Sequence, residues 1–198
     1  MIQEALAQMT RWRRQGLVIP VSVNVSARHL QEAGFVAALA RHLEEHPEVP
    51  PHWLELEILE TSALDDVNMV VKLMRQCQDL GLRFALDDFG TGYSSLTYLR
   101  RLPAQLLKID QSFIRDMLED QGDLAIVSGV VGLAKAFQRS VIAEGVETVE
   151  HGRVLLSLGC DLAQGFGIAK PMAADDLVLW IAQWNDCGAG EWIRQSAQ

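Results

Sequence analysis

LRFALDDFGTGYS, residues 82–94, joins an apolar run to two adjacent carboxylates and a glycine-rich turn. The apolar run predicts a short buried strand, which places Asp87 and Asp88 at its carboxyl end. Parallel α/β folds carry their chemistry at that end of their strands. Gly90 and Gly92 then allow the backbone to turn closely around a ligand. The stretch therefore predicts a parallel α/β fold with a metal site after this strand.

Short apolar strands followed by helix-length segments recur along the chain. Six strands are predicted, at residues 18–25, 54–59, 83–87, 106–109, 141–143 and 161–166. Such alternation implies a parallel sheet with right-handed crossovers, and its near-continuous repetition favours a barrel over a doubly wound sheet. A barrel of this type needs eight strands and about 250 residues, with about 200 as the lower limit. The sequence thus predicts an incomplete TIM-like (β/α) barrel.

The composition indicates one globular domain. Its 198 residues are 49% apolar and 22% charged, which suffices for one core of ordinary size. The formal net charge of -9 argues against a nucleic-acid polymer as partner, because such partners require a basic face. Three cysteines without paired spacing, Cys77, Cys160 and Cys187, favour reduced thiols and a cytoplasmic location.

Neither a signal peptide nor a membrane segment is predicted. The first 15 residues have polar side chains throughout and predict an amphipathic helix. The longest apolar stretch, residues 124–137, is too short and too interrupted to span a bilayer, and it predicts a buried helix.

Polar side chains stand at or after the end of each predicted strand. They are Asn24, Glu57, Asp87, Asp88, Lys108, Asp110, Glu144, Glu147 and Gln164. Because the strand ends of a barrel meet at one rim, we expect these side chains to line a single shallow bowl. Carboxylate and amide oxygens without histidine or cysteine suit Mg²⁺ or Mn²⁺ better than Zn²⁺.

Several of these groups also admit purely structural roles. The aspartate pair could cap a helix beginning near Ser94, and Asn24 could be only a hydrogen-bonding residue at a strand end. Lys108 and Asp110 could form a structural ion pair. The two glutamates after the fifth strand could satisfy amide donors at an ordinary helix start.

Seven blocks of the sequence, in order and consistently spaced, resemble the EAL-type phosphodiesterases, which hydrolyse the bacterial second messenger cyclic di-GMP. The blocks are SVNVS (22–26), LEILE (56–60), DDFGTGYSS (87–95), LKID (107–110), AEGVET (143–148), QGF (164–166) and KPM (170–172). Residues 1–198 are accordingly identified as a single EAL domain shortened at its start, with residues 185–198 expected as a loose C-terminal tail. The resemblance implies a barrel of the EAL type with about six of its eight strands present.

The resemblance also implies a role for each matching residue. The metal ligands would be Asn24, Glu57, Asp87, Asp88 and Glu144, with the first aspartate bridging two cations. The catalytic residues would be Glu144 as proton acceptor and Lys108 as the group that orients water. Residues that support the bowl or contact substrate would be Glu60, which anchors the glycine-rich loop, and Gly90, Thr91, Gly92, Tyr93, Glu147, Gln164 and Pro171.

The implied reaction is metal-dependent hydrolysis of cyclic di-GMP to linear pGpG. Two Mg²⁺ or Mn²⁺ ions held about 3.5 to 4 Å apart would neutralise the phosphodiester and stabilise the departing oxygen. The expected partners are cyclic di-GMP itself and either a second copy of the chain or an upstream sensory or GGDEF domain. The alternative is a module that binds cyclic di-GMP, or that dimerises, without hydrolysis.

Two departures from the family pattern bear on activity. The family's Glu-Ala-Leu tripeptide lies on an early strand and is followed two residues later by an arginine, and together they supply a metal ligand and a substrate contact. Here the tripeptide at residues 4–6 is followed by Gln8 and has helical spacing, so it belongs to the helix before the first predicted strand. We therefore expect weak or no hydrolysis by this chain alone. Leu59 also stands where the family usually has threonine, beside Glu60.

Overall fold

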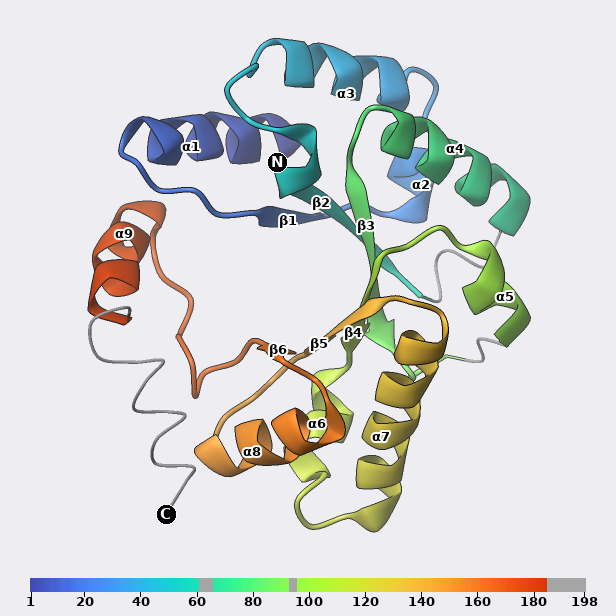
Figure 1. The fold of residues 1–198 in the computed structure, drawn as a ribbon. Helices are drawn as coiled ribbons and strands as arrows, with labels where there is room; N and C mark the ends of the chain where they lie inside the picture. Colours follow the sequence, from blue (N-terminus) through green and yellow to red (C-terminus); the bar gives the residue numbers. More distant parts are fainter. Residues whose placement is uncertain (61–65, 93–95, 185–198) are drawn as a thin grey trace.

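The computed structural model describes residues 1–60, 66–92 and 96–184. Within them six parallel strands pair in chain order, so that β1 and β6 form the two edges of the sheet. The strands are β1 (Val21–Asn24), β2 (Leu54–Leu59), β3 (Arg83–Phe89), β4 (Leu106–Ile109), β5 (Ser140–Ala143) and β6 (Leu162–Ala163). The sheet curls into a half-barrel with helices around its outside (Figure 1). The incomplete TIM-like barrel predicted from the sequence is thus confirmed.

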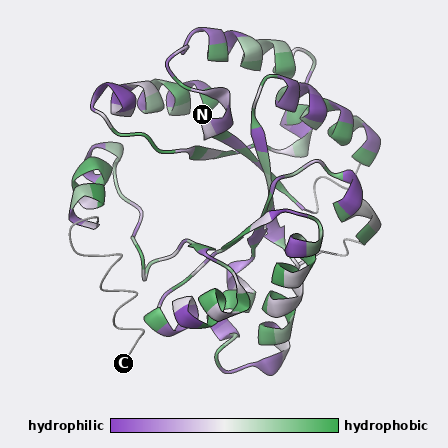
Figure 2. Cartoon of the chain, in the orientation of Figure 1, coloured by the Kyte–Doolittle hydropathy of each residue, from purple (hydrophilic) through white to green (hydrophobic). Residues whose placement is uncertain are grey.

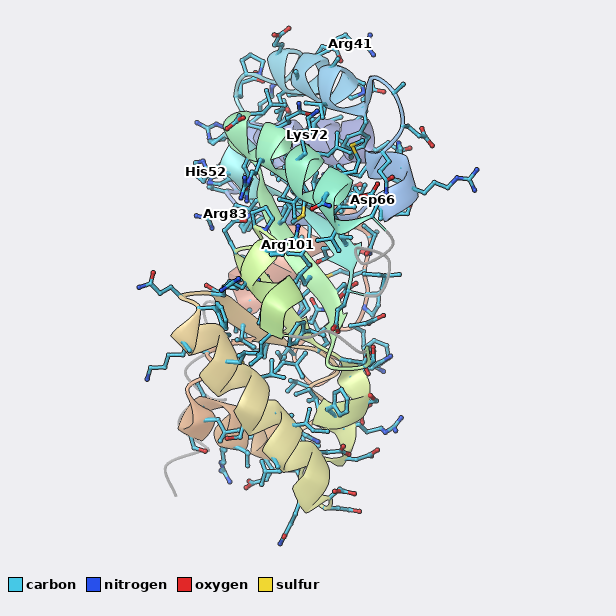
Figure 3. The ribbon with its side chains drawn as sticks, turned by 90° about the vertical axis from the view of Figure 1, so that its right-hand side faces the viewer. Arg41, His52, Asp66, Lys72, Arg83 and Arg101 are labelled. Carbon is cyan, nitrogen blue, oxygen red and sulfur yellow. The ribbon has the colours of Figure 1, made fainter. Side chains whose placement is uncertain are left out.

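Helices follow the strands, as the alternating pattern predicts, and α4, α5 and α7 cover one side of the sheet (Figure 3). The helices are α1 (Ile2–Arg14), α2 (Ala27–Leu30), α3 (Phe35–Glu44), α4 (Val67–Asp79), α5 (Leu96–Arg101), α6 (Gln111–Asp116), α7 (Gln121–Ala136), α8 (Val149–Leu158) and α9 (Ala174–Gln183), with a 3₁₀ turn at Pro51–Trp53. Trp12 of α1 donates its indole N–H to the carbonyl of Ala174 at 3.1 Å, which connects α1 to the start of α9. None of the described helices is long and apolar enough to cross a membrane.

The first and the last strand were predicted too long. The first strand begins at Val21 instead of residue 18, because Pro20 precedes it and cannot donate a ladder hydrogen bond. It ends where Ser26 caps α2 by accepting the backbone N–H of His29. The last strand keeps two residues, Leu162 and Ala163, because the backbone beyond it bonds to the loop after β5. The third strand is instead longer than predicted and reaches Phe89.

Two predicted helices also differ in detail. The predicted amphipathic helix at the start is α1, which contains residues 4–6 and buries Leu6, Met9 and Trp12. The predicted buried helix at residues 124–137 is the longer α7, of which one stripe around Val127 and Val131 is buried, so that prediction was right for one face only. Both hydrophilic and hydrophobic residues occur on these outer helices (Figure 2). The predicted tail at residues 185–198 lies outside the described residues.

Alternation along the strands gives the sheet two different faces. In β2, Leu54, Leu56 and Ile58 are fully buried, while Glu55 and Glu57 belong to the opposite face. Neighbouring strands pair Leu56 with buried Val23 and Phe84, so the same face of each strand joins the apolar core. The core therefore lies between sheet and helices, and the concave face is left for polar side chains.

Candidate metal centre

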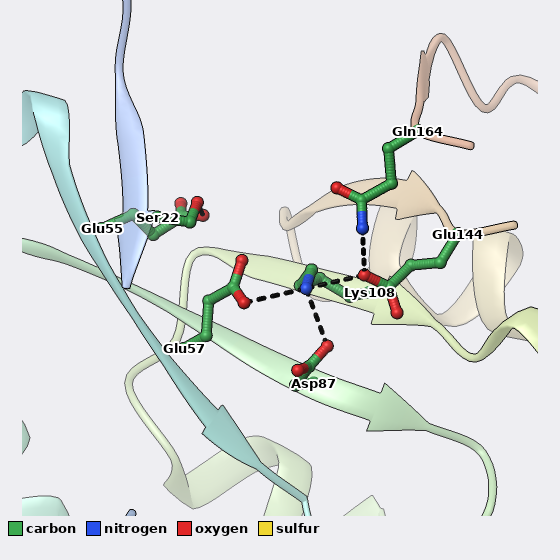
Figure 4. Close-up of polar contacts among 7 residues, drawn as sticks. All are labelled: Ser22, Glu55, Glu57, Asp87, Lys108, Glu144 and Gln164. Carbon is green, nitrogen blue, oxygen red and sulfur yellow. Dashed lines mark hydrogen bonds and ion pairs between the residues drawn. The ribbon is translucent and has the colours of Figure 1, made fainter. Parts of the chain in front are cut away.

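Lys108 lies at the centre of a group of carboxylates on the concave face (Figure 4). Its Nζ lies 2.9 Å from Glu57 Oε2, 2.8 Å from Asp87 Oδ1 and 2.6 Å from Glu144 Oε1. These residues come from β4, β2, β3 and the loop after β5. Lys108 is 5% exposed, so water competes little for these ion pairs. The strand ends predicted to form one bowl do converge.

Strand register explains how two adjacent aspartates reach the same bowl. Glu57 pairs with Ala85, and Leu59 pairs with Asp87, so Glu57 and Asp87 belong to one face of the sheet. Asp88 would then face the core, but the pairing of β3 with β4 shifts at this point. Asp88 has a φ of 54°, in the left-handed region that aspartate enters more readily than most residues. Its carboxylate thereby stays on the side of Asp87.

The charges of the bowl are unbalanced. Burial alone would lower the pKa of Lys108, but the hydrogen bonds that its ammonium donates to the carboxylates of Asp87, Glu144 and Glu57 raise it above its ordinary value, so the side chain stays an ammonium. Burial raises the pKa of Glu144, and the neighbouring Lys108 opposes that rise. The pKa of Asp88 is also raised, first by burial and then by the charge of Asp87. One ammonium thus faces more carboxylates than it can neutralise.

This donor set fits a divalent cation. Carboxylate oxygens of Asp87, Asp88 and Glu144 all lie within 4.8 Å of one another. Hard oxygen donors at such spacing suit Mg²⁺ or Mn²⁺, and a divalent cation would offset the excess negative charge. Asn24 stands beside them, since it pairs in register with Glu57 and its side chain is exposed.

Glu60 connects the ends of the two central strands. Its side chain is 2% exposed, and its Oε2 accepts the backbone N–H of Gly90 at 3.0 Å. Its own N–H donates to the carbonyl of Asp87 at 3.0 Å. Gly90 has a φ of 104°, and a Cβ there would lie 3.0 Å from the ring of Phe113, so a glycine is required. The glycine-rich loop is therefore held beside the carboxylates despite the leucine at position 59.

The rest of that loop is only partly described. Thr91 turns back on the strand end, donating its backbone N–H at 3.3 Å and its hydroxyl at 2.9 Å to the carbonyl of Asp88. Gly92, the next residue, is half-buried. Tyr93 and Ser94 lie outside the described residues, so the predicted contact of Tyr93 and the alternative of a helix cap near Ser94 are not tested.

The far side of the bowl opens into a pocket. Gln164 donates its amide N–H to Glu144 Oε1 at 2.5 Å and so holds that carboxylate from the β6 side. Glu144 and Gln164 line a pocket of about 740 Å³ together with Glu147, Phe166 and Pro171. Glu147 therefore lies beside the bowl instead of among the partners of Lys108.

Two structural alternatives from the sequence are wrong. Asp110 does not act as the ion-pair partner of Lys108 but caps α6, accepting the backbone N–H of Ser112 at 2.9 Å. Glu144 and Glu147 do not begin a helix, because α8 starts at Val149 and is capped by Thr148.

Asp110 was expected among the side chains of the bowl, but no metal-binding or catalytic role was predicted for it. Its carboxyl lies within hydrogen-bonding reach of Asp88, and this contact adds to the causes that raise the pKa of Asp88, after burial and the charge of Asp87. Despite burial, hydrogen bonds from Ser112 hold the pKa of Asp110 below its ordinary value. Its position directly after the fourth strand, two residues beyond Lys108, is the signal that placed it among the side chains of the bowl.

The model of the EAL domain family matches residues 1–171. The bifunctional diguanylate cyclase/cyclic di-GMP phosphodiesterase MucR of Pseudomonas aeruginosa is 40% identical over 182 residues, which are 91% of this chain and 26% of MucR. The chain thus spans about a quarter of that relative.

Solved structures show the same likeness. A complex of the MucR phosphodiesterase with c-di-GMP superposes with a TM-score of 0.84 at 40% identity, covering 89% of this chain and 71% of that one. The manganese/cyclic di-GMP complex of BlrP1 from Klebsiella pneumoniae has a TM-score of 0.79 at 28% identity, covering 87% of this chain and 43% of that one. From its sequence, its half-barrel and its acidic bowl, this chain belongs to the EAL domain family.

Proposed function

We propose that this chain is a metal-dependent phosphodiesterase unit whose substrate is cyclic di-GMP and whose product is linear pGpG. The observation that carries the proposal is the convergence of Glu57, Asp87 and Glu144 on one buried point at the carboxyl ends of the strands. Support comes from the MucR relative, which is named a cyclic di-GMP phosphodiesterase and whose phosphodiesterase was solved with that ligand.

We assign the cation ligands to oxygens of the bowl. They are Asn24, Glu57, Asp87, Asp88 and Glu144, with the carboxylate of Asp110 beside Asp88. Bound Mg²⁺ or Mn²⁺ would neutralise the phosphodiester and activate water for attack. Manganese is favoured as a probe because the related BlrP1 structure is a manganese complex.

Side chains of the protein would accept the proton and bind the substrate. Glu144 accepts a proton, and Gln164 keeps its carboxylate oriented through the 2.5 Å hydrogen bond. Lys108 supplies a compact positive charge near the attacked phosphate. The pocket of about 740 Å³ beside Glu144, with Phe166 and Pro171 in its walls, would hold part of the dinucleotide.

We further propose that hydrolysis by this chain alone is weak. The tripeptide at residues 4–6 lies within α1 and reaches no strand end, and β1 is an edge of the sheet in the described residues. The family places one oxygen ligand and the substrate arginine on an earlier strand. Residues 4–8 supply neither of them.

The test is formation of pGpG from cyclic di-GMP with Mg²⁺ and with Mn²⁺. Turnover should be low in the unmodified chain and abolished by Glu57→Ala, because that variant removes a carboxylate from the bowl. Glu55→Gln is the matched control, since Glu55 lies on the same strand and face but bonds to Ser22 at 3.0 Å instead of Lys108. Equal pGpG formation by the Glu57 variant and the unmodified chain would contradict the proposal.

The second candidate function is binding of cyclic di-GMP without hydrolysis. The helical position of residues 4–6 favours it, because Glu4 supplies no ligand to the bowl in which Glu57, Asp87 and Glu144 converge. Calorimetry with cyclic di-GMP and Ca²⁺ separates the two functions. Heat of binding without pGpG formation in Mg²⁺ or Mn²⁺ would identify a binding module.

We also propose that the unit works in the cytoplasm beside a further signalling domain or a second copy. The proposal of a neighbouring domain is supported by MucR, a bifunctional cyclase and phosphodiesterase of which the chain spans 26%. The cytoplasmic location is supported by the free thiols of Cys77 and Cys160.

A further inference from the structure

The ammonium of Lys108 is saturated by carboxylates. An ammonium has three N–H donors, and here three carboxylate oxygens lie 2.6 to 2.9 Å from Nζ. All three belong to residues that the proposed function assigns to cation binding: Glu57, Asp87 and Glu144. Lys108 therefore lies between the groups that would hold the cation, as the close-up view shows (Figure 4).

Those carboxylates need a positive charge to remain together. Glu57 and Asp87 are 7% and 9% exposed, so water screens their mutual repulsion poorly. When no metal ion is bound, the positive charge in contact with these carboxylates is the ammonium of Lys108. The ammonium thus stabilises the bowl when no metal is bound.

The same contacts oppose cation binding. A carboxylate oxygen that accepts a short, charge-assisted hydrogen bond offers less electron density to a cation on the same atom. In addition, an ammonium and a divalent cation sharing the same carboxylates would lie a few ångströms apart, where a protein screens repulsion much less than water does. Binding of the cation must therefore loosen some of the ammonium's bonds.

We propose that Lys108 is the internal counter-cation of the metal-free bowl, and that a divalent cation binds by displacing its ammonium from some of the carboxylates. This inference rests on the proposed metal-dependent function and adds a role for Lys108 that precedes catalysis. Lys108 acts here as a positioning residue, because it keeps Glu57, Asp87 and Glu144 in place until the cation arrives.

The test compares Lys108→Met with the unmodified chain by titration with Mn²⁺ alone, followed by electron paramagnetic resonance of the free ion. Methionine keeps the length of the side chain and removes its charge. The variant should bind Mn²⁺ at least about tenfold more tightly, because a competing positive charge is gone. Lys72→Met is the matched control, since exposed Lys72 lies on outer helix α4, away from the bowl, and its Mn²⁺ affinity should equal that of the unmodified chain (Figure 3).

Thermal unfolding supplies an independent measurement. In a chelator, Lys108→Met should unfold at a lower temperature than the unmodified chain, and saturating Mn²⁺ should raise its midpoint more than it raises that of the unmodified chain. A variant that folds only with Mn²⁺ also supports the inference. Should it fold in neither condition, Lys108→Gln, which keeps hydrogen-bond donors without the charge, is titrated in its place and should show the same gain in affinity.

The outcomes separate this inference from the function on which it rests. If the unmodified chain binds Mn²⁺ and the Lys108 variants bind it no more tightly, the counter-cation role is overturned while the metal centre stands. If the unmodified chain binds no Mn²⁺, both the metal centre and the role of Lys108 are overturned.

Discussion

Glu60 is a single buried carboxylate that connects two strand ends. It accepts the N–H of Gly90 at 3.0 Å, and its own N–H bonds to Asp87, so the glycine-rich loop and the first aspartate share one anchor. Glu60→Ala would leave the Gly90 amide without its acceptor, which costs about 1–3 kcal/mol for a buried donor. We expect a loss of unfolding free energy of that size in urea, together with weaker Mn²⁺ binding because the loop after Asp88 loosens.

Glu60→Gln is the informative control for that prediction. Its amide oxygen can still accept from Gly90, so most of the stability should return. If the alanine variant matched the unmodified chain in both stability and Mn²⁺ affinity, the anchoring role would be excluded.

The thiols of Cys77 and Cys160 should be unreactive in the folded chain. Burial raises the pKa of each to about 11 from an ordinary value of 9.0. Only the thiolate attacks a disulfide reagent, so at pH 8 the raised pKa alone reduces the reactive fraction about 100-fold. We expect a Cys187→Ser variant to react with such a reagent at least about 100-fold more slowly when folded than in urea. Comparable rates in both states would contradict the burial of these residues.

The same shift predicts how stability depends on pH. Because the folded state holds these protons more tightly than the unfolded chain, the stabilisation is complete below pH 9 and is lost as pH rises towards 11. Urea unfolding at pH 8 and at pH 11 should therefore show a lower free energy at the higher pH. Replacing both cysteines with alanine should reduce this difference in unfolding free energy between pH 8 and pH 11. An unchanged difference would mean that other groups cause it.

At this scale, the residue types at the strand ends could be predicted but their contacts could not. Asp87 and Glu57 follow from the rule that strand ends meet at one rim. That Lys108 contacts both depends on strand register, which no local pattern encodes. The inward turn of Asp88 and the nearness of Asp110 depend on a shift in pairing between β3 and β4, which is likewise a tertiary feature.

Among the secondary-structure elements, β6 is held by its neighbouring loop more than by its ladder. Its two residues pair with β5, while Val146 donates to the carbonyl of Gln164 at 3.0 Å and accepts from Gly167 at 2.9 Å. A Cβ on Gly165 would lie 2.3 Å from the backbone of Val146, so this glycine permits the close approach. The position of Gln164, and through it that of Glu144, depends on this packing.

Gly165→Ala should therefore separate β6 from the loop after β5. Backbone atoms must move to admit the methyl group, which costs about 1–3 kcal/mol of unfolding free energy. The hydrogen bond from Gln164 to Glu144 should also be lost, with a fall in pGpG formation. Both are measurable, by urea unfolding and by product assay.

Gly132→Ala is the matched substitution for comparison. Gly132 lies in α7, and apart from its chain neighbours and the backbone of that helix, no atom lies within 4 Å of a Cβ placed there. Alanine should stabilise the helix by about 0.5–1 kcal/mol. If both glycine variants changed stability in the same direction, the close approach at Gly165 would not be the cause.

Strand length was the element-scale feature that the sequence predicted least well. The sequence predicts strands over residues 18–25 and 161–166, yet β1 is limited by Pro20 and the Ser26 cap, and β6 by bonds to a loop that follows β5. Both shortened strands are edge strands. An edge strand lacks a neighbour on one side, so its length depends on local capping instead of on a full ladder.

For the whole molecule, the number of strands could be predicted because each βα unit is local in sequence. The curl of the sheet and the open concave face could not, since they arise from the summed twist of five strand pairings. The open face leaves Leu59 and Leu162 at 40% and 44% exposure. These exposed apolar side chains, and two edges that no other described strand pairs with, together favour association between copies.

Self-association through β1 is the consequence that can be tested. Val25 donates its N–H to Glu57 of β2, and in a parallel ladder every second residue faces the same neighbour. The N–H of Ser22 therefore points to the open edge. We expect the weight-average mass in sedimentation to rise above the monomer mass of 22.0 kDa as concentration increases through the micromolar range.

Ser22→Pro should weaken that association while leaving the pairing of β1 with β2 in place. Proline removes the outward N–H and obstructs a further strand, and edge positions tolerate it. Ser22→Ala is the matched control, because it loses the 3.0 Å hydrogen bond to Glu55 but keeps the backbone donor, and it should associate like the unmodified chain. If the unmodified chain stayed at 22.0 kDa throughout, the edge would not be an association surface. Association that survived Ser22→Pro unchanged would instead place the contact at β6 or on the apolar part of the concave face.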